Sequence, residues 1–420
     1  MSDFRSIFSG KKITVMGLGL LGRGLNDTLF LVKCGARVTV TDLKSREQLA
    51  ASLEKLEELN VQIRVGGHHQ ADFLDADMIL RNADVPKSSP FLKLSREKGI
   101  PVEMDESLFC KHFKGLVIGI TGTRGKTTTT QLIHRILSRS KPKVFLAGNI
   151  MGLATLPLLE HATDDDIVVL ELSSWQLQGF HEAKMSPAGS VFTNIYPDHL
   201  NRYTDMEAYI WDKKAIYRYQ RGSDFCLFNG DQVATKILSD EAPAGKDLFS
   251  FADTPSDLAL RIPGEHNLSN VAAAWRLSSR LGISDEVIRT SVEDFDGVEH
   301  RIETVGVKNG VTFINDSTST TPVAGIMALN TVQARRIFLL AGGADKNLNL
   351  ETFAQKASQK AHWIALLDGT ATSRLHSDLV TFGAGDKIIG VFDDLRKAVL
   401  ALFDKASQGD TILLSPACAS

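Results

Sequence analysis

One segment constrains the fold of this chain more than any other. It is an apolar stretch followed by a glycine-rich loop, a lysine and a row of threonines. Residues 117–130 are Val-Ile-Gly-Ile-Thr-Gly-Thr-Arg-Gly-Lys-Thr-Thr-Thr-Thr. This order predicts a strand, a phosphate-binding loop and a helix, because glycine N–H groups can close on phosphate oxygens at a helix N-terminus. Lys126 would reach the β- and γ-phosphates, and Thr127 or Thr128 would offer a hydroxyl to Mg²⁺. The loop predicts ATP binding; a plain strand-to-helix turn is the alternative, since Ile120 replaces the first glycine of the strict pattern.

The bulk properties exclude several classes of protein. A length of 420 residues suits about two to four domains. A net charge of −3 gives no broad basic surface for nucleic acid, and four scattered cysteines suggest neither a disulfide framework nor a zinc site. The N-terminus lacks the apolar core of a signal peptide, and no apolar run approaches the roughly 20 residues that span a bilayer. We therefore expect a soluble, cytoplasmic protein that binds neither nucleic acid nor membrane.

The first block of the chain carries a dinucleotide-binding pattern. A strand at 12–16 leads into Gly-Leu-Gly-Leu-Leu-Gly at 17–22, and a second strand at 37–41 ends at Asp42. Glycines in this spacing, followed about 20 residues later by an acid, are typical of a Rossmann unit. The ligand stays open on these residues alone: it is a nicotinamide or flavin cofactor, or another nucleotide diphosphate.

The second block places a carboxylate beside the phosphate loop. A strand over 166–170 ends in Glu171, and a further strand at 190–194 ends in the polar segment 195–199. Glu171 is either an exposed strand-end residue or, as is typical downstream of a phosphate loop, an acid that organises Mg²⁺. Alternating strands and helices predict a mostly parallel sheet, whose ligands collect at the C-terminal strand ends.

The third block repeats the same alternation, with apolar strands each followed by polar residues at 311–315, 337–340, 364–367, 388–391 and 411–414. We therefore predict an α/β fold of three domains. These are a Rossmann-like unit at 1–104, a central phosphate-loop domain with a parallel sheet at 105–299, and a Rossmann-like unit at 300–420.

Seven segments in this order resemble the signatures of the Mur ligase family, the ATP-dependent enzymes that form amide bonds in peptidoglycan synthesis. They lie at 121–127, 170–177, 194–203, 264–270, 300–303, 315–317 and 413–420. The resemblance covers almost the whole chain. It implies that the first block holds the uridine diphosphate of a substrate and not NAD. The implied partners are UDP-N-acetylmuramoyl-L-alanine and glutamate, and the implied state is a monomer.

The resemblance also implies a reaction. The γ-phosphoryl group of ATP passes to the alanine carboxylate, the amine of D-glutamate attacks the acyl phosphate, and phosphate leaves. Lys126 and Mg²⁺, expected as two ions, would neutralise the charge on the transferring phosphoryl group.

Site residues follow from the resemblance one by one. Catalytic roles fall to Lys126, Glu171, His199 and Lys213, and metal binding to Thr127, Glu171, His199 and, once carbamylated, Lys213. ATP contacts fall to Gly122, Thr123, Arg124, Gly125, Lys126, Thr127, Thr128, Asn270, Arg301 and Asp316. UDP-sugar contacts fall to Leu18, Gly19, Asp42, Lys44, Asn82, Asn149 and Gln176, and amino-acid contacts to Thr320, Lys346 and Ser420. Two alternatives stay open for Lys213: the register could place this role on the adjacent Lys214, or both could be solvated lysines on a helix.

Two departures keep alternatives open. Thr318 stands where many relatives carry a lysine that helps hold glutamate, so the added amino acid could be L-glutamate or another residue. The chain stops at Ser420, where relatives continue for about one helix, so the third domain is expected to be short at its end. A non-catalytic nucleotide-binding relative is the other alternative. An oxidoreductase built on the first block would leave the phosphate loop without a task.

Overall fold

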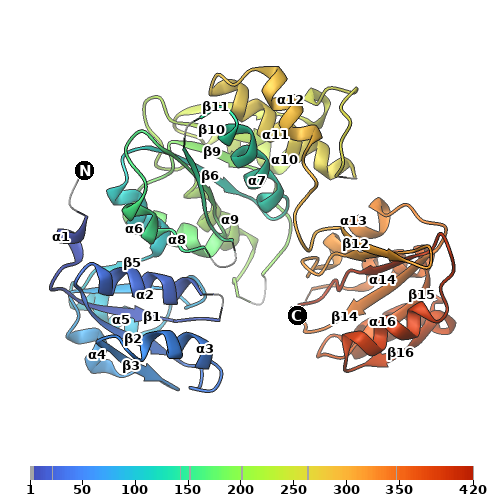
Figure 1. Cartoon of the computed structure of the whole chain (residues 1–420), viewed down its shortest axis with the longest axis horizontal. Coiled ribbons are helices and arrows are strands. Elements are labelled where there is room, and N and C mark those ends of the chain that lie inside the picture. The colour runs from blue at the N-terminus through green and yellow to red at the C-terminus, as the bar shows by residue number, and fades with distance from the viewer. Residues whose placement is uncertain are drawn as a thin grey trace. The chain divides into compact units, whose positions relative to one another are not determined.

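The structure, a computed structural model, describes residues 4–20, 22–141, 143–150, 153–199, 202–262, 264–346 and 348–419, and within them the strands form three sheets (Figure 1). The chain divides into two compact units. The first comprises 1–195, 209–253 and 270–291, and the second comprises 196–208, 254–269 and 292–420. The predicted α/β class is confirmed, while the domain boundaries at 104 and 299 stay a prediction.

The first sheet has the strand order β3-β2-β1-β4-β5, and all its pairs are parallel. Its strands are β1 (Lys12–Met16), β2 (Arg37–Asp42), β3 (Val61–Val65), β4 (Met78–Arg81) and β5 (Val102–Glu103). The helices of this segment are α1 (Arg5–Phe8), α2 (Arg23–Lys33), α3 (Ala50–Leu53), η1 (Glu54–Leu56), α4 (Gln70–Leu74) and α5 (Pro90–Glu97). This is the Rossmann order, in which the chain reverses direction across the sheet between β1 and β4. A ligand site is expected at that point, where the glycine turn follows β1.

The second sheet has the order β11-β10-β9-β6-β8-β7 and is also parallel throughout. Its strands are β6 (Leu116–Thr121), β7 (Val144–Gly148), β8 (Ile167–Glu171), β9 (Gly189–Phe192), β10 (Phe225–Asn229) and β11 (Gly245–Phe249). The helices along this stretch are α6 (Asp105–His112), α7 (Lys126–Ser138), η2 (Leu156–Glu160), α8 (Ser174–Ala183), α9 (Met206–Lys214), α10 (Val233–Asp240), η3 (Phe251–Asp253), α11 (Glu265–Arg280) and α12 (Asp285–Glu293). The phosphate loop follows β6, which lies between β8 and β9. Residues at the ends of these two neighbouring strands are therefore in position to contact the loop.

The third sheet has the order β12-β13-β17-β14-β15-β16 and is parallel except at one edge. Its strands are β12 (Glu303–Lys308), β13 (Val311–Asn315), β14 (Ile337–Gly342), β15 (Ala361–Leu367), β16 (Ile388–Phe392) and β17 (Thr411–Leu414). The helices are α13 (Pro322–Thr331), α14 (Glu351–Lys360), α15 (Thr372–Thr381), η4 (Gly385–Lys387) and α16 (Leu395–Phe403). The edge strand β12 pairs antiparallel with β13 through a turn at Asn309 and Gly310, both with positive φ. This hairpin is absent from the predicted strands.

Strand β14 shows why the third sheet is covered on both faces. All six of its residues are buried. Leu339 packs into one apolar cluster with α13, α14 and α15, whereas Phe338 and Leu340 pack into another with α16. Successive side chains of a strand point to opposite faces, so a continuous apolar run marks a strand with helices on both sides.

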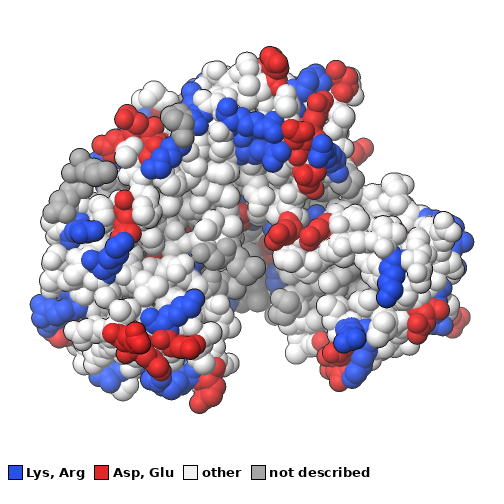
Figure 2. All heavy atoms as spheres, viewed as in Figure 1, with Lys and Arg blue, Asp and Glu red and all other residues white. Residues whose placement is uncertain are grey.

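Charged side chains of both signs are interspersed over the face drawn in Figure 2. This distribution agrees with the net charge of −3. None of the helices in the described residues is long and apolar enough to cross a membrane.

Candidate functional site

The phosphate loop takes a backbone path that only glycine can follow at two positions. Gly122 has φ +148° and Gly125, which caps the N-terminus of α7, has φ +76°. A Cβ atom at Gly122 would overlap the hydroxyl of Thr193, and one at Gly125 would overlap the side-chain amide oxygen of Asn270. Other L residues would strain the backbone and push these neighbours away.

The end of β9 holds the loop from one side. The side chain of Asn194 accepts a hydrogen bond from Arg124 N (2.8 Å) and donates one to Arg124 O (3.1 Å). The hydroxyl of Thr193 donates to the same carbonyl oxygen (2.6 Å). These three bonds fix both polar backbone groups of Arg124. The centre of the loop is therefore held by two residues that lie 69 and 70 positions later in the chain.

Lys126 begins α7 and its ammonium lies over the loop. Its Nζ donates to the carbonyl oxygens of Gly122 and Thr123, both at 3.1 Å. Thr127 and Thr128 follow in the first turn of the helix, where N–H groups and the helix dipole favour an anion. The loop therefore brings together a flexible cation, hydroxyls and a positive helix end, as triphosphate binding requires.

Lys213, on α9, lies under the same loop. Its Nζ donates to Gly122 O (2.7 Å) and to the hydroxyl of Thr121 (3.3 Å), and the residue is 1% exposed. The neighbouring Lys214 instead forms an ion pair with Glu241 (2.6 Å). Of the two adjacent lysines, Lys213 is thus the one that contacts the phosphate loop.

Glu171 ends β8 beside the phosphate loop, since it pairs with Ile120 in the strand register. Its Oε1 accepts a hydrogen bond from Asn149 Nδ2 (3.0 Å), whereas its buried Oε2 has no hydrogen-bond partner among the described residues. A buried carboxylate oxygen without a partner is unfavourable by about 1–3 kcal/mol or more, and a divalent cation would satisfy it.

The chemistry of these donors fits Mg²⁺ in particular. No cluster of three His, Cys, Asp or Glu side chains suited to a metal occurs in the described part of the chain. Mg²⁺ is usually held by one or two carboxylates together with substrate phosphates and water, not by a cage of protein ligands. A single buried carboxylate beside a phosphate loop is consistent with this mode of Mg²⁺ coordination.

Substituting Gly125 with alanine tests the tight fit of the loop. We expect a loss of stability of about 1–3 kcal/mol from the positive φ. We also expect about tenfold weaker ADP binding, because each 1.4 kcal/mol of strain at the loop is a factor of ten. Gly222→Ala is the matched control: its φ is +58°, but nothing lies within 4 Å of the added Cβ. Calorimetric titration that finds equal ADP affinity for the two variants would contradict the role of crowding against Asn270.

The predicted UDP-sugar residues of the first sheet gather around the glycine turn. Asp42 Oδ2 accepts from Gly19 N (3.0 Å) and Asp42 Oδ1 accepts from Lys44 N (2.9 Å). Asn82 Nδ2 donates to Gly17 O (3.2 Å), and Leu18 is completely buried. These residues come from the C-terminal ends of β1, β2 and β4, which is the edge where Rossmann units bind ligands.

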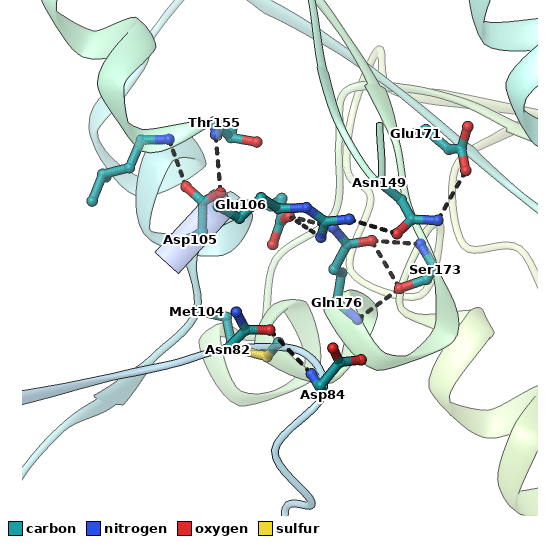
Figure 3. Close-up of polar contacts among 12 residues, drawn as sticks. Asn82, Asp84, Met104, Asp105, Glu106, Asn149, Thr155, Glu171, Ser173 and Gln176 are labelled. Atoms are coloured by element: carbon teal, nitrogen blue, oxygen red, sulfur yellow. Dashed lines mark hydrogen bonds and ion pairs between the residues drawn. The ribbon is translucent and has the colours of Figure 1, made fainter. Parts of the chain in front are cut away.

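Asn149 and Gln176 bring the second sheet into this region (Figure 3). Gln176 completes a capping box with Ser173, whose N–H and hydroxyl both donate to Gln176 Oε1 at 2.8 Å. The other end of the Gln176 amide donates to Glu106. Asn149 bonds Glu171, as described above. Of the seven residues that the resemblance assigns to the sugar nucleotide, Asn149 therefore contacts the candidate metal ligand directly, and Gln176 contacts Glu106.

Three charged residues in this region were not predicted. Arg23, the first residue of α2, donates from Nη2 to Asn149 Oδ1 (2.8 Å), and its Nη1 lies 3.9 Å from Glu106 Oε1. Asp105 accepts hydrogen bonds from the backbone N–H groups of Thr155 (2.9 Å) and the following residue. Their sequence signal is slight: Arg23 directly follows the last glycine of the turn, and Asp105 and Glu106 are adjacent acids that open a helix.

Burial and its neighbours raise the pKa of Asp105 to about 7, from an ordinary 3.8. Burial is the largest cause and the Glu106 carboxylate the next. Burial likewise raises the pKa of Glu106 and of Asp27. A raised folded-state pKa favours the folded state below the unfolded value near 4, and this contribution is lost as pH rises through 7.

We therefore expect the ligand-free protein to lose stability between about pH 4 and pH 7. Since one pKa unit corresponds to about 1.4 kcal/mol, the loss from Asp105 should exceed that figure. Asp105→Asn, which keeps one of the two acceptor oxygens and removes the titrating group, should flatten the pH dependence of the melting temperature. The control Asp75→Asn removes an exposed carboxylate paired with Lys12 and should leave the slope unchanged. An equally steep slope in Asp105→Asn would contradict the assignment.

In the second compact unit, His199 takes a left-handed backbone conformation with φ +57°. Its N–H donates to Asp198 Oδ1 (2.8 Å), and its Nε2 lies 3.7 Å from Asp198 Oδ2. Asp198 is 5% exposed, so the imidazole lies against a buried carboxylate. A carboxylate beside the imidazole is a common second partner of metal-binding histidines.

The third-sheet residues also come together at the C-terminal strand ends. Lys346 Nζ donates to the hydroxyl of Thr320 (3.0 Å), so the two predicted amino-acid contacts are neighbours. Asp316 is buried and accepts from the hydroxyl of Ser415 (2.9 Å). Burial raises the pKa of Asp316, and the charge of Arg301 opposes this shift. Ser420, the third predicted amino-acid contact, lies outside the described residues.

Comparison with known protein families accounts for most of the chain in three consecutive segments. Residues 11–103 match the N-terminal domain of MurD-like Mur ligases, residues 120–255 the Mur ligase middle domain, and residues 300–418 the Mur ligase glutamate ligase domain. These matches follow the same order as the three sheets.

Full-length relatives and solved structures agree with these matches. A protein of Roseiflexus sp. (strain RS-1) named UDP-N-acetylmuramoylalanine–D-glutamate ligase is 38% identical, covering 98% of this chain and 95% of the relative. One of the same name from Clostridioides difficile (strain 630) is 35% identical, with 98% and 94% covered. The chain is similar in fold to UDP-N-acetylmuramate-alanine ligase MurC of Thermotoga maritima, with a TM-score of 0.65, 19% identity, and 97% and 96% covered. It is also similar to the MurF ligase of Thermotoga maritima in complex with ADP, with a TM-score of 0.60, 19% identity, and 98% and 92% covered.

Proposed function

Because this chain belongs to the Mur ligase family, we propose that it is the ATP-dependent ligase that adds D-glutamate to UDP-N-acetylmuramoyl-L-alanine in peptidoglycan precursor synthesis. Relatives that carry the name of this activity align with almost the full chain. The observation that carries the proposal is the buried, partnerless Oε2 of Glu171 next to a braced phosphate loop. With Oε1 bonded to Asn149 and Oε2 without a hydrogen-bond partner, this carboxylate is suited to a metal-bound triphosphate.

The reaction must give a carboxylate a leaving group. The γ-phosphoryl group of ATP transfers to the alanine carboxylate, and the bond from its phosphorus to the bridging oxygen of ADP breaks. The amine of glutamate then attacks the acyl carbon, loses a proton, and phosphate leaves as the amide forms. Negative charge spreads over the phosphoryl oxygens during transfer, so the main tasks of the protein are positioning and electrostatic stabilisation.

Lys126 and the loop supply most of that stabilisation. The ammonium of Lys126 can leave the carbonyl oxygens of Gly122 and Thr123 for the β- and γ-phosphates, since its side chain is only part-buried. The loop N–H groups and the α7 N-terminus bind phosphate oxygens. We assign adenine contacts to Asn270, which lies against Gly125, and further ATP contacts to Arg301 and Asp316.

We assign Mg²⁺ to Glu171, Thr127 and His199, with two ions expected, and with Lys213 as a further ligand when carbamylated. When bound, Mg²⁺ neutralises phosphate charge and orients the transferring group. Glu171 has the oxygen available, as described above. Carbamylation of Lys213 by carbon dioxide would form a bond from Nζ to the carbon and replace an ammonium with an anionic oxygen ligand, and two protons would be released.

For the amino acid, the contact between Lys346 and Thr320 supports a site for a carboxylate. Thr318, which replaces the lysine of many relatives, donates instead to His300 O (2.8 Å). One cationic contact to a dicarboxylic substrate is therefore missing, and L-glutamate or another amino acid is the main competing acceptor. We expect the enzyme to act as a monomer in the cytoplasm, where ATP is available.

One incubation tests the proposal. The protein is mixed with ATP, Mg²⁺ and UDP-N-acetylmuramoyl-L-alanine, and each glutamate enantiomer is added separately. Phosphate release and the product mass are followed. We expect ADP, phosphate and the dipeptide product only when sugar nucleotide and D-glutamate are both present. Product formed with L-glutamate and not with D-glutamate would show that L-glutamate is the added amino acid. A lack of phosphate release under every condition would indicate a non-catalytic relative.

A further inference from the structure

We infer that Arg23 is a positioning residue that connects the glycine turn of the sugar-nucleotide site to the metal-binding carboxylate. The inference rests on the proposed function, because it takes Glu171 as the Mg²⁺ ligand. The connection runs from Arg23 through the amide of Asn149 to Glu171. Neither the family pattern nor the sequence motifs pointed to Arg23.

The chemistry of the three groups fixes the direction of the connection. An arginine has only donors and a carboxylate has only acceptors, so the Asn149 amide can bridge them in one orientation. Its oxygen faces Arg23 Nη2 at 2.8 Å and its nitrogen faces Glu171 Oε1 at 3.0 Å. In Figure 3 the Asn149 amide nitrogen points toward Glu171. With Oε1 held in this way, Oε2 is the oxygen that stays available to a cation.

The position of Arg23 is itself fixed by burial and by charge. The side chain of Arg23 is 15% exposed and that of Glu106 is 3% exposed, so their 3.9 Å separation is only weakly screened. Glu106 is held in turn by the Gln176 amide, within the capping box of α8. The planar guanidinium can therefore donate to the Asn149 amide oxygen and pair with the Glu106 carboxylate at the same time. An ammonium could not do both with the same geometry.

The other end of the connection is the substrate unit. Arg23 directly follows Gly22, the residue with φ +82° that caps the N-terminus of α2. A diphosphate bound over this helix N-terminus would lie at the backbone of Arg23. Binding of the sugar nucleotide and orientation of Glu171 are thus linked through the side chain of Arg23. Its hydrogen bond to Asn149 joins two residues that are 126 positions apart in the sequence.

The test compares two arginines that each join the first sheet segment to the second. Arg23→Met breaks the connection to Glu171. Arg96→Met is the matched control: among the described residues, Arg96 bonds Glu182 (2.7 Å) and the carbonyl oxygen of Lys87, and neither is a site residue. Binding of Mn²⁺ with a non-hydrolysable ATP analogue is measured by electron paramagnetic resonance on the full chain. We expect about tenfold weaker Mn²⁺ binding in Arg23→Met, as is usual when an outer partner of a metal ligand is lost. We expect no change in Arg96→Met.

Two further measurements separate positioning from mere support of the fold. Arg23→Lys keeps the charge beside Glu106 but not the fork, so it should fold normally and still bind Mn²⁺ more weakly. Asn149→Ala should weaken Mn²⁺ binding by a similar factor, and the double variant Arg23→Met/Asn149→Ala should be no weaker than either single variant. Wild-type Mn²⁺ affinity in Arg23→Lys and Arg23→Met, or additive effects in the double variant, would overturn the inference.

Failure of the proposed function would look different. Saturating UDP-N-acetylmuramoyl-L-alanine should tighten Mn²⁺ binding in the wild type and not in Arg23→Met. If this sugar nucleotide changes nothing in the wild type, the proposed substrate is wrong, while the comparison of Mn²⁺ affinities without it still decides the role of Arg23.

Discussion

Replacing Lys126 with alanine is expected to reduce ligation by about 10³-fold or more, since a single cation on a transferring phosphoryl group can contribute that much. The reason is geometric as well as electrostatic. Lys126 Nζ donates to the loop carbonyls of Gly122 and Thr123 and is therefore already at the loop. Lys213 shares the Gly122 carbonyl, but its side chain is buried, whereas that of Lys126 is only part-buried. The measurement is phosphate release with both substrates at saturation.

The control for this variant is Lys246→Ala, which removes an exposed lysine paired with Asp240 and should keep full activity. The melting temperature of Lys126→Ala should stay close to that of the wild type, because the bonds of the ammonium to the loop carbonyl oxygens are part-buried and not in the core. Near-normal turnover in a folded Lys126→Ala protein would contradict the location of the ATP site.

Glu171→Gln should separate activity from stability. Glutamine can still accept the hydrogen bond from Asn149, but it cannot supply an anionic oxygen to Mg²⁺. We expect kcat to fall by about 100-fold or more and the Mg²⁺ concentration for half-maximal activity to rise, as the loss of even an outer partner can change metal sites tenfold to 100-fold. The metal-free variant should be at least as stable as the wild type, because it removes a buried carboxylate whose Oε2 has no hydrogen-bond partner and keeps the acceptor for Asn149.

The opposite pattern would disprove this role for Glu171. A lower melting temperature with unchanged Mg²⁺ dependence would make Glu171 a structural residue. Glu182→Gln provides the comparison, because it removes a carboxylate from the surface pair with Arg96 and should alter neither quantity beyond about 1 kcal/mol.

The phosphate loop was predictable because its determinants are contiguous. The strand, the two glycines with positive φ, Lys126 and the threonines all lie between 117 and 130, and each has a local steric or electrostatic reason. The same holds for the glycine turn at 17–22 and for the parallel sheets, whose apolar runs lie between helical segments. In these segments the conformation that the local sequence favours is the one that the complete fold contains.

The hairpin at the edge of the third sheet shows a different kind of miss. Asn309-Gly310 is a strong signal for a two-residue turn, because both residues accept positive φ. The strand before it, β12, has mainly exposed residues after Glu303 and lacks a continuous apolar run. A search for buried strands passes over such an edge strand, so the turn had to be recognised first.

Arg23, Asp105 and Glu106 could not be predicted because their roles depend on contacts between distant segments. Arg23 meets Asn149 across 126 residues, and Gln176 meets Glu106 across 70. An arginine after a glycine and two acids at a helix start are ordinary surface residues when considered alone. Contacts within the second segment pair Asp105 and Glu106, and the packing of the first segment against the second pairs Arg23 with Asn149.

The bonds that Thr193 and Asn194 make to Arg124 have a consequence for each catalytic cycle. A loop that was loose without nucleotide would lose conformational freedom every time ATP bound, and that loss would weaken binding. Here the backbone of the phosphate loop is ordered once, when the chain folds and these bonds form. Successive nucleotides then enter a shape that is already made, and their binding energy remains available for the chemistry.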